Sequence, residues 1–453
     1  MIKHYHSKPH VRENIITLKE QYPQEFGNFI MALKNLEDSD DWSRICGIHG
    51  NTFKPNDPGV LCPTDPKIVA KIAKTGEPAY CAHSVEPFIA WHVPYLYEFE
   101  QMLNKYNHSK NKEYITLPYF DISQQAYDYS FLNCSEITIL YNYKTITIRN
   151  PLASAYYYPK GEKTKIIRNG IVNATCKKDQ IRLKTIRRQL FNTLHAKTYE
   201  EFSSQIVSVV KTYKPYGYVP LETPHNSIHD IIGGDGGNMS DISISAFDPI
   251  FWLHHCNMDR FFYNWLKHIK MTEHTFSKNS LDATLAPFSK RPIFGWQNNT
   301  NDFLLLKDVI DIHQYPYIYS PIVLRTLETK TAYIDIVDIS IPPESVTIHG
   351  HLIPKGLHVT DDIKDDWYVG SVSWFGLNRT LTYCSRCEKV KTNLKIDILD
   401  FIHTHNISHE TINNYELVLE CKGKLIKNLN EEYMNYNIND IIKDGTVTIN
   451  ISQ

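Results

Sequence analysis

The first part of the chain places apolar residues every three to four positions, the spacing that forms one face of an amphipathic helix. Such stretches cover residues 12–37 and 85–104, two successive segments within 178–212, and a last segment from Asp248 to about Ile269. Asp248 suits the N-cap of that last helix, and the proline after it suits the first helical position. The pattern therefore predicts a bundle of helices.

After about residue 315 the pattern changes to short segments in which β-branched or aromatic residues alternate with polar ones. The clearest are TAYIDIVDISI, ESVTIHGHLI, WYVGSVSWFG and NYELVLECKG. Alternation of this kind between turn signals is typical of antiparallel strands with one buried face. We therefore predict a mainly α helical-bundle domain over residues 1–320, followed by a mostly antiparallel β C-terminal domain over residues 321–453.

Composition and charge argue against several classes of function. The 453 residues carry a net charge of −2 at pH 7, so no basic excess favours nucleic acid or an anionic membrane as a partner. No apolar run reaches the ~20 residues of a membrane span, and the first residues contain no apolar core of an export signal. The nine cysteines are odd in number and mostly isolated, which argues against a disulfide framework. We therefore expect a cytoplasmic protein.

The segment TPHNSIHDIIGG, residues 223–234, sets two histidines four positions apart. Residues at this spacing share one face of a helix, so His225 and His229 can both face one metal ion. Thr223 is predicted as the N-cap, with Pro224 next, and two glycines end the helix. The zinc-protease form of this motif has glutamate after its first histidine, where this chain has Asn226. Alone, the pair is more typical of two surface histidines.

The segment DPIFWLHHCNMDR, residues 248–260, places His254 and His255 inside an apolar helix. Burying an imidazole costs free energy unless its nitrogens have partners. Two adjacent histidines in an apolar helix therefore suggest a role beyond packing. Adjacent helical residues point about 100° apart, so one metal ion would take one of the two. Spacing alone does not choose between them.

Three further histidines precede these: His49 in CGIHG, and His83 and His92 in YCAHSVEPFIAWHVPYLYEFE. Facing helices of a bundle commonly hold metal sites in the core. Imidazole suits zinc, copper, iron and nickel, and no aspartate or glutamate occupies a matching ligand position. Six histidines without a carboxylate favour a pair of copper ions.

Together with LPYFDIS at residue 117, these segments resemble the type 3 copper proteins, which are the tyrosinases, catechol oxidases and molluscan haemocyanins. The resemblance implies two sets of three copper ligands, His49, His83 and His92, then His225, His229 and His255. His254 is then a neighbour of the second set. Dioxygen is the co-substrate that the resemblance implies.

The resemblance also assigns roles to residues around the histidines. Cys81 matches a cysteine that fungal and molluscan members join to the second histidine, here His83, by a thioether; a buried cysteine without that bond is the alternative. Glu222 and Asn226 match a pair that holds a water for deprotonating the phenol, although Glu222 also suits a helix start.

Two more positions are expected at the substrate pocket. Phe251 resembles a pocket-lining residue and fits plain core equally well. Asp230 directly follows His229, where many members carry an apolar or basic residue, so this departure bears on substrate preference.

The C-terminal part resembles the C-terminal domain of fungal tyrosinases through YPYIY at 315–319, YVGSVSWFG, and CSRC at 384–387. CSRC also fits a zinc half-site or a redox pair. The resemblance implies that this domain covers the copper site, with an aromatic residue or a leucine from its strands in the substrate's place. A connector at 315–330 is then the expected cleavage point for an activating protease.

We therefore expect a latent, fungal-type dicopper phenol oxidase that acts on small phenols. It would hydroxylate monophenols, oxidise o-diphenols to o-quinones with dioxygen, and serve melanin biosynthesis. The alternatives are an o-diphenol-only catechol oxidase, a haemocyanin-like dioxygen carrier and a zinc-binding structural protein.

Overall fold

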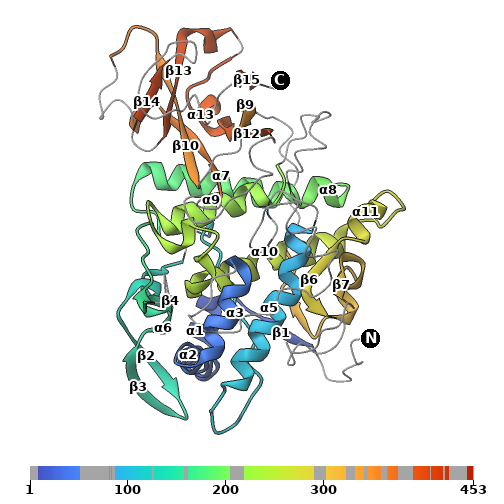
Figure 1. Cartoon of the computed structure of the whole chain (residues 1–453). Coiled ribbons are helices and arrows are strands. Elements are labelled where there is room, and N and C mark those ends of the chain that lie inside the picture. Colours follow the sequence, from blue (N-terminus) through green and yellow to red (C-terminus); the bar gives the residue numbers. More distant parts are fainter. Residues whose placement is uncertain are drawn as a thin grey trace.

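A computed structural model describes residues 9–50, 81, 83, 87–124, 127–157, 162–204, 219–289, 303–322, 332–340, 345–358, 365–375, 391–408, 410–421, 424–427 and 446–451. A helical domain forms most of the molecule, and a smaller β domain lies at one end of it (Figure 1). This architecture confirms the predicted fold class, a mainly α domain followed by an antiparallel β domain.

The helices are α1 (Ile15–Gln21), α2 (Pro23–Glu37), α3 (Asp40–Gly50), α5 (Phe88–Lys105), α6 (Pro151–Ser154), α7 (Lys177–Thr193), α8 (Tyr199–Phe202), α9 (Glu222–Gly233), α10 (Pro249–His268), α11 (Lys278–Leu281) and α13 (Leu399–Thr404). Short 3₁₀ turns are η1 (Ser130–Asn133), η4 (Asn238–Ser240), η5 (Ser245–Phe247), η6 (Leu306–Asp308), η7 (Ile312–Gln314) and η8 (Thr411–Asn414).

The strands of the helical domain are β1 (His10–Arg12), β2 (Glu136–Tyr141), β3 (Lys144–Arg149), β4 (Tyr156–Tyr157), β5 (Thr164–Lys165), β6 (Thr284–Ser289), β7 (Phe303–Leu305) and β8 (Tyr317–Tyr319). Those of the β domain are β9 (Ala332–Ser340), β10 (Val346–Pro354), β11 (Tyr368–Trp374), β12 (Lys391–Asp397), β13 (Tyr415–Cys421), β14 (Lys424–Lys427) and β15 (Thr446–Ile451).

The predicted helices form where the structure describes them, with differences at their ends. Of the second helix expected within 178–212, α8 covers Tyr199–Phe202, and residues 205–212 lie outside the described residues. The expected helix at 12–37 is split into α1 and α2 because Pro23 lacks an amide hydrogen and begins a new helix. The predicted cap of α10 is confirmed, since the Asp248 carboxylate accepts a hydrogen bond from the Ile250 amide at 3.0 Å and Pro249 follows. The sequence prediction missed α3, whose last turn contains two glycines that weaken the helical signal.

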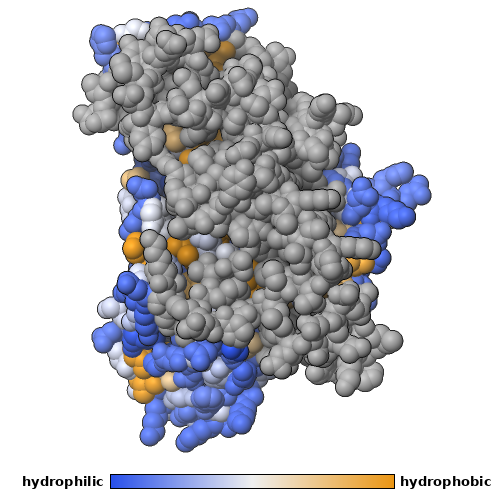
Figure 2. Space-filling view, viewed as in Figure 1, coloured by the Kyte–Doolittle hydropathy of each residue, from blue (hydrophilic) through white to orange (hydrophobic). Residues whose placement is uncertain are grey.

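The core of the helical domain forms around α5 and α10. The rings of Phe99 and Trp252 stack at 3.8 Å between centroids, and Tyr95 packs against the same indole at 4.6 Å. On the face shown in Figure 2, hydrophilic residues dominate the described surface beside α11 and around α1 and α2. Helices α1 and α2 therefore turn apolar faces inward, as their periodicity predicted.

A buried ionic cluster joins the start of the chain to the end of the helical domain. The Arg12 guanidinium donates to Glu100 at 2.8 Å and to Asp259 at 3.1 Å, and it lies 3.4 Å over the ring of Tyr317. The hydroxyls of Tyr317 and Tyr319 both donate to Asp259. Every charge of the cluster therefore has an opposite charge or hydrogen bond nearby, which a buried guanidinium requires.

This cluster corrects the predicted connector at 315–330. Tyr317 and Tyr319 are buried within the helical domain, and β8 pairs in parallel with β1. Residues 315–322 therefore belong to the helical domain and are not a loose linker. Residues 323–330 lie outside the described residues.

The β domain contains two antiparallel sheets, ordered β11-β10-β13-β14 and β12-β9-β15. The four strands expected from alternation are confirmed as β9, β10, β11 and β13. On β10, Ile348 and Leu352 enter the domain's own core, whereas Thr347 and His349 face the helical domain. The CSRC pair lies outside the described residues.

Helices α7 and α9 lie between the helical body and the β domain (Figure 1). Strands β10 and β11 contact α9, and β11 also contacts α7. The domain boundary therefore passes beside α9, the helix of the HNSIH motif. Among the described residues, no helix combines the length and apolarity needed to cross a membrane.

Candidate metal centre

Three histidines from α9 and α10 converge on one point. The Nε2 atom of His255 lies 3.4 Å from Nε2 of His225 and 3.2 Å from Nε2 of His229. Two nitrogens bound to one metal ion at about 2 Å would stand about 3.3 Å apart. The spacing of these nitrogens therefore fits a shared metal ion, and His255 is the member of the adjacent pair that aims at it.

His254 is a close neighbour of this group. Its ring lies 5.2 Å from that of His225 and 4.8 Å from that of His229, and a nitrogen of each of the four histidines lies within 4.8 Å of the others. Neither nitrogen of His254 has a hydrogen-bond partner, although the side chain is buried. His254 is thus within reach of the group, without the direct nitrogen contacts of His255.

Partners on the far side of the rings fix the direction of each ligand. The Nδ1 atom of His229 lies 2.8 Å from the Met239 carbonyl oxygen, and Nδ1 of His225 lies 2.9 Å from Oδ1 of Asn226. Each Nδ1 therefore donates its proton outward, which leaves Nε2 as the metal-binding atom. This is the tautomer that a copper ligand needs.

The ends of α9 differ in part from the prediction. The helix begins at Glu222 with Leu221 as its N-cap, so the prediction of Thr223 as N-cap is wrong, and Thr223 lies in the first turn. The glycine end is confirmed, because Gly234 has a φ of 64° and follows the helix directly. This turn lets residue 239 return beneath the helix, where its carbonyl reaches His229.

A second group contains His49, Cys81 and His92, whose donor atoms lie within 4.8 Å of one another. The Nδ1 atoms of His49 and His92 lie 2.9 Å from the Ile242 carbonyl and 2.8 Å from the Phe88 carbonyl. Gly50 permits the first of these contacts, since a Cβ there would lie 2.1 Å from the Ser243 carbonyl oxygen.

His83 lies beside this group and not within it. Its Nδ1 is 3.8 Å from the Cys81 sulfur, and its ring is 5.7 Å from those of both His49 and His225. The Cys81 sulfur is also 3.4 Å from Nε2 of His92. The structure therefore brings five of the six predicted ligands into two groups, and it places His83 between them.

The two groups share a wall. The rings of His92 and His255 stack at 4.1 Å with an interplanar angle of 15°. Phe251 packs beneath both groups, 4.7 Å from the ring of His49 and 4.2 Å from that of His255. Two metal ions held here would belong to one binuclear site, with Phe251 as buried packing behind the ligands.

The state of the imidazoles suits metal binding. Burial lowers the pKa of His49 to about 4 and that of His225 to about 3, and it lowers the pKa of the other histidines of the site as well. Neutral imidazole is the form that ligates a metal. The Nε2 atoms of His49 and His83 have no hydrogen-bond partner, and a metal ion would satisfy such atoms. A donor set of imidazoles without carboxylate fits copper.

Glu222, the proton acceptor that the family resemblance assigns, is held by a residue that the sequence analysis did not single out. Glu222 is buried, and its carboxylate accepts a hydrogen bond from the hydroxyl of Ser204. Glu222 and Asn226 lie one helical turn apart on α9 and share a face. The sequence analysis missed Ser204, because no local motif connects it with a residue eighteen positions later.

A phenylalanine from the β domain packs against the histidines of the site. The Phe375 ring stacks on His229 at 4.1 Å and 20°, and it lies 5.3 Å from the ring of His83 and 6.0 Å from that of His225. It is 1% exposed. The sequence predicted an aromatic residue or leucine within the strands, and the structure places Phe375 directly after β11.

Asp230 lies at the same boundary. Burial raises the pKa of its carboxyl to about 6, and the hydroxyls of Thr347 and Ser373 donate hydrogen bonds to it. The distance from Thr347 Oγ1 to Asp230 Oδ2 is 2.9 Å. Asp230 therefore contacts the β domain beside the metal ligand His229.

Charged residues of α7 hold the β domain in place. The Arg188 guanidinium lies 2.8 Å from one carboxylate oxygen of Asp397 and 2.7 Å from one of Asp400. Lys184 pairs with Asp400 at 2.9 Å, and Lys178 lies 5.2 Å over the ring of Tyr368. The interface is therefore strongly polar, which is typical of contacts that can open.

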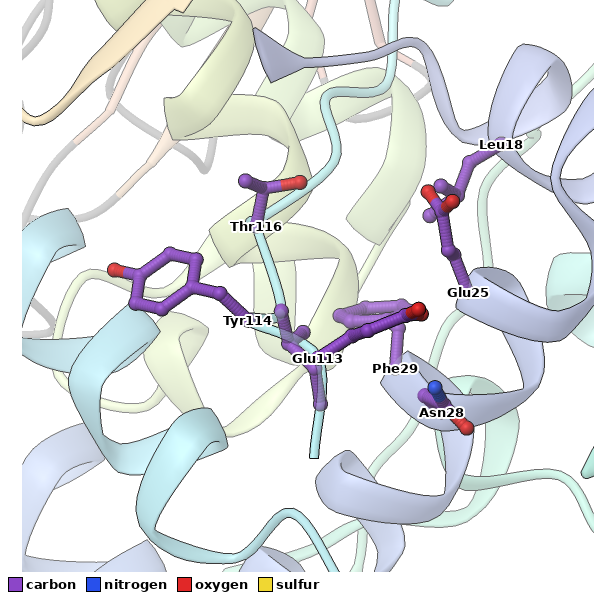
Figure 3. Close-up of a pocket in the computed structure, with 8 residues that line it drawn as sticks. Leu18, Glu25, Asn28, Phe29, Glu113, Tyr114 and Thr116 are labelled. Atoms are coloured by element: carbon purple, nitrogen blue, oxygen red, sulfur yellow. The ribbon is translucent and has the colours of Figure 1, made fainter. Parts of the chain in front are cut away.

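A separate small pocket lies between α1, α2 and residues 113–116 (Figure 3). Glu25 and Glu113 both border it, and burial together with this second carboxylate raises the pKa of Glu25. None of the histidines described above lines it. This pocket is therefore not part of the metal centre.

Comparison with known proteins gives the same picture. The model of the common central domain of tyrosinase matches residues 39–268. The chain is 28% identical to a tyrosinase of Neurospora crassa over 301 residues, which is 56% of this chain and 43% of that protein. It is 25% identical to haemocyanin A-type of Enteroctopus dofleini over 309 residues, 64% of this chain and 20% of that protein.

The fold also agrees with a solved structure. This chain superposes on mushroom tyrosinase from a crystal that contains its latent and active forms, with a TM-score of 0.67 and 18% sequence identity. The superposition covers 95% of this chain and 97% of the mushroom chain. The similarity therefore extends over both domains. In sequence, the chain spans about half, or less, of the length of the tyrosinases that it matches.

Proposed function

We propose, because the chain belongs to the tyrosinase family, that it is a dicopper phenol oxidase made in a latent form. The observation that carries this proposal is the meeting of two buried histidine groups through His92 and His255. The copper pair, when bound, supplies the redox chemistry by which dioxygen oxidises a phenol. The ligands would be the two sets of three histidines that the family resemblance assigns.

The chain's own residues would position the phenol and accept its proton. Glu222 and Asn226 share one face of α9 beside His225, so a water held between them could take the phenolic proton. Asn226 also orients His225 through its Oδ1 atom. Ser204 in turn fixes the Glu222 carboxylate.

Latency would follow from Phe375. Its ring occupies the space over His229 that the ring of a phenol would need, and burial against three histidines excludes water from that face. Release of the β domain, by an activating protease or by reversible opening, would expose the site. We further propose a cytoplasmic location and a role of the quinone product in melanin formation.

Two alternative functions would give different results in an activity assay. A haemocyanin-like carrier would bind dioxygen without consuming phenols, and the similarity to haemocyanin A-type supports this second candidate. A catechol oxidase would consume o-diphenols only. The test is turnover of L-tyrosine and of a catechol by copper-loaded chain before and after limited proteolysis. Oxidation of both after cleavage supports the proposal, and oxidation of neither, with two coppers retained, supports the carrier.

We expect a covalent bond between Cys81 and the imidazole of His83 in the copper-loaded protein. The sulfur lies 3.8 Å from Nδ1 of His83, so the thiol and the imidazole that the thioether would join are already neighbours. The bond replaces the S–H and one ring C–H, with dioxygen as the oxidant. Peptide mass analysis should show one cross-linked species, lighter by the two lost hydrogens.

A Cys81→Ser variant is the control, because it cannot form the species. Full alkylation of Cys81 in active, copper-loaded protein would contradict the prediction. That result would instead favour the thiol as a ligand, since the sulfur is 3.4 Å from Nε2 of His92.

The pair of carboxylates around Arg188 should control how tightly the β domain closes. We expect Arg188→Met to weaken closure by about 3 kcal/mol, because two partly buried carboxylates lose their counter-charge. Lys184→Met is the matched control, since its exposed pair is worth about 1 kcal/mol or less. The measurement is the rate of trypsin cleavage C-terminal to Ile322. Equal rates for both variants would contradict this role of Arg188.

His349 should make closure sensitive to acid. Burial, with the nearby charges of Lys178 and Arg182, lowers its pKa to about 2, and Glu420 acts in the opposite direction. An exposed histidine has a pKa of about 6.5. Below this pH, His349 therefore binds a proton in the open form but remains neutral in the closed form. The equilibrium constant for closure is therefore unaffected by His349 above about pH 6.5, and it falls by up to about tenfold for each pH unit below that value. Asp230 has the opposite effect. Its pKa is raised to about 6 in the closed form, so its protonation below about pH 6 favours closure.

A His349→Leu variant should accordingly stay closed at a pH where the native chain has opened. The radius of gyration from X-ray scattering, followed from pH 7 to pH 4, measures the opening. His351→Leu serves as a control on the same strand, because His351 keeps Glu420 at 3.2 Å as a partner. Identical pH profiles for native chain and the His349 variant would show that another group controls the opening.

A further inference from the structure

Tyr143 is the most exposed large apolar side chain among the residues that the structure describes. It is 72% exposed, whereas Tyr22 and Tyr127, the next most exposed tyrosines of the described residues, reach 42% and 36%. Among these tyrosines, the phenol of Tyr143 is therefore the most accessible to another molecule.

The turn that carries Tyr143 would favour a different residue. Strands β2 and β3 are joined by only two residues, Asn142 and Tyr143, whose φ angles are 50° and 64°. A two-residue hairpin turn with positive φ at both positions is of type I′, and its second position usually holds glycine. A bulky side chain in this left-handed region costs free energy, and an exposed ring recovers little of it through burial. Folding alone therefore does not explain a tyrosine here, which points to a role in function.

Two hydrogen bonds hold the tip of this hairpin in place. The Oε1 atom of Gln24 accepts from the Tyr143 amide at 3.0 Å, and Oδ1 of Asn142 accepts from the Lys110 amide at 2.8 Å. The hairpin lies at the end of the helical domain opposite to the β domain (Figure 1). The Tyr143 ring is thus carried by a fixed, narrow turn, away from α9 and the metal ligands of its own chain.

Phe375 shows that an aromatic ring can lie against the site's histidines while it is still attached to polypeptide. Its ring stacks on His229 at 4.1 Å, although the residue belongs to the chain that directly follows β11. The side chain is buried, so the whole ring is inserted between the two domains. Once the β domain has moved, the same place is open to a tyrosine that is carried by a turn of another protein molecule.

We propose that Tyr143 of one copy of this chain is oxidised at the opened metal centre of a second copy. The inference rests on the proposed function and adds a protein substrate to it. The tyrosine ring gains one oxygen atom on the carbon beside its hydroxyl, and the ring carbon and the hydroxyl each lose one hydrogen, which gives a protein-bound o-quinone. Dioxygen is the oxidant, and its second oxygen atom leaves as water with these two hydrogens.

The test mixes two forms of the chain that mass spectrometry can distinguish. The oxidising copy is copper-loaded chain, opened by limited proteolysis and then freed of protease. The target copy is the full chain with His255→Ala, labelled with a heavy nitrogen isotope, so that it cannot oxidise phenols itself. Ascorbate added at the end reduces the quinone to a catechol, so each oxidised peptide gains one oxygen atom. In the target copy, the Tyr143 peptide should gain oxygen at least about tenfold faster than the Tyr22 peptide, because loop tips are the more accessible sites.

Tyr143→Phe in the target copy is the matched variant, because it keeps the ring and removes only the hydroxyl. It should abolish the fast modification, whereas Tyr22→Phe should leave that modification unchanged. The proposal is overturned if Tyr143 gains oxygen no faster than Tyr22, or if the target stays unmodified while the same oxidising copy consumes free L-tyrosine. Failure of the proposed function has a different signature, since the oxidising copy would then leave free L-tyrosine unoxidised as well.

Discussion

Replacing His255 with alanine should remove copper from the second site and lower phenol oxidation at least about a thousandfold. The reason is geometric, because Nε2 of His255 lies 3.2 to 3.4 Å from the Nε2 atoms of both His225 and His229. Among the described residues of this group, His254 offers the remaining imidazole, and its nitrogens make no hydrogen-bond-length contact with the converging atoms. Metal analysis after gel filtration, together with catechol turnover, measures both effects.

His254→Ala is the matched control. It removes a buried imidazole from the next position of the same helix, but one whose nitrogens make no contact with the converging atoms. We expect this variant to retain two coppers, with His92→Ala emptying the first site and His229→Ala the second. Greater copper loss in His254→Ala than in His255→Ala would move the ligand to His254.

Replacing Phe375 with alanine should give the intact chain most of the activity that proteolysis gives the native chain. The substitution removes the ring that stacks on His229 and leaves space of the size of a catechol. It also removes about 3 to 5 kcal/mol of buried aromatic contact between the domains, which favours opening further. Turnover of 4-methylcatechol by uncleaved chain measures the effect, with copper content checked in the same samples.

A Phe375→Leu variant distinguishes plugging from loosening. Leucine keeps an apolar side chain in the site, so the chain should remain largely latent while losing part of the packing. If Phe375→Ala is as inactive as native chain and both become active after cleavage, another part of the β domain blocks the site.

Much of the helical domain was predictable because its signals are local. The spacing of His225 and His229 on one helix, and the Asp248–Pro249 start of α10, can be interpreted from a few neighbouring residues. The alternation in β10 likewise predicted a strand. The choice of His255 over His254 was different, since it came from the family resemblance and the structure supplies its geometry.

What the sequence could not predict depends on contacts between distant segments. The Ser204 hydroxyl reaches Glu222, Thr347 reaches Asp230, and Phe375 reaches His229, and no periodicity links such partners. Tyr319 was assigned to the edge of a linker because nothing local shows that it meets Arg12 in the core. Thr223 was a suitable cap by residue type, but the N-cap of α9 is Leu221, two residues earlier.

The central claim is that two histidine groups form one binuclear copper centre. Its most direct test is the metal content of the full chain, produced with copper and freed of loosely bound metal. Mass spectrometry of the native protein, which retains bound ions, should show two copper ions per chain. A single copper, or zinc in place of copper at either position, would contradict the account.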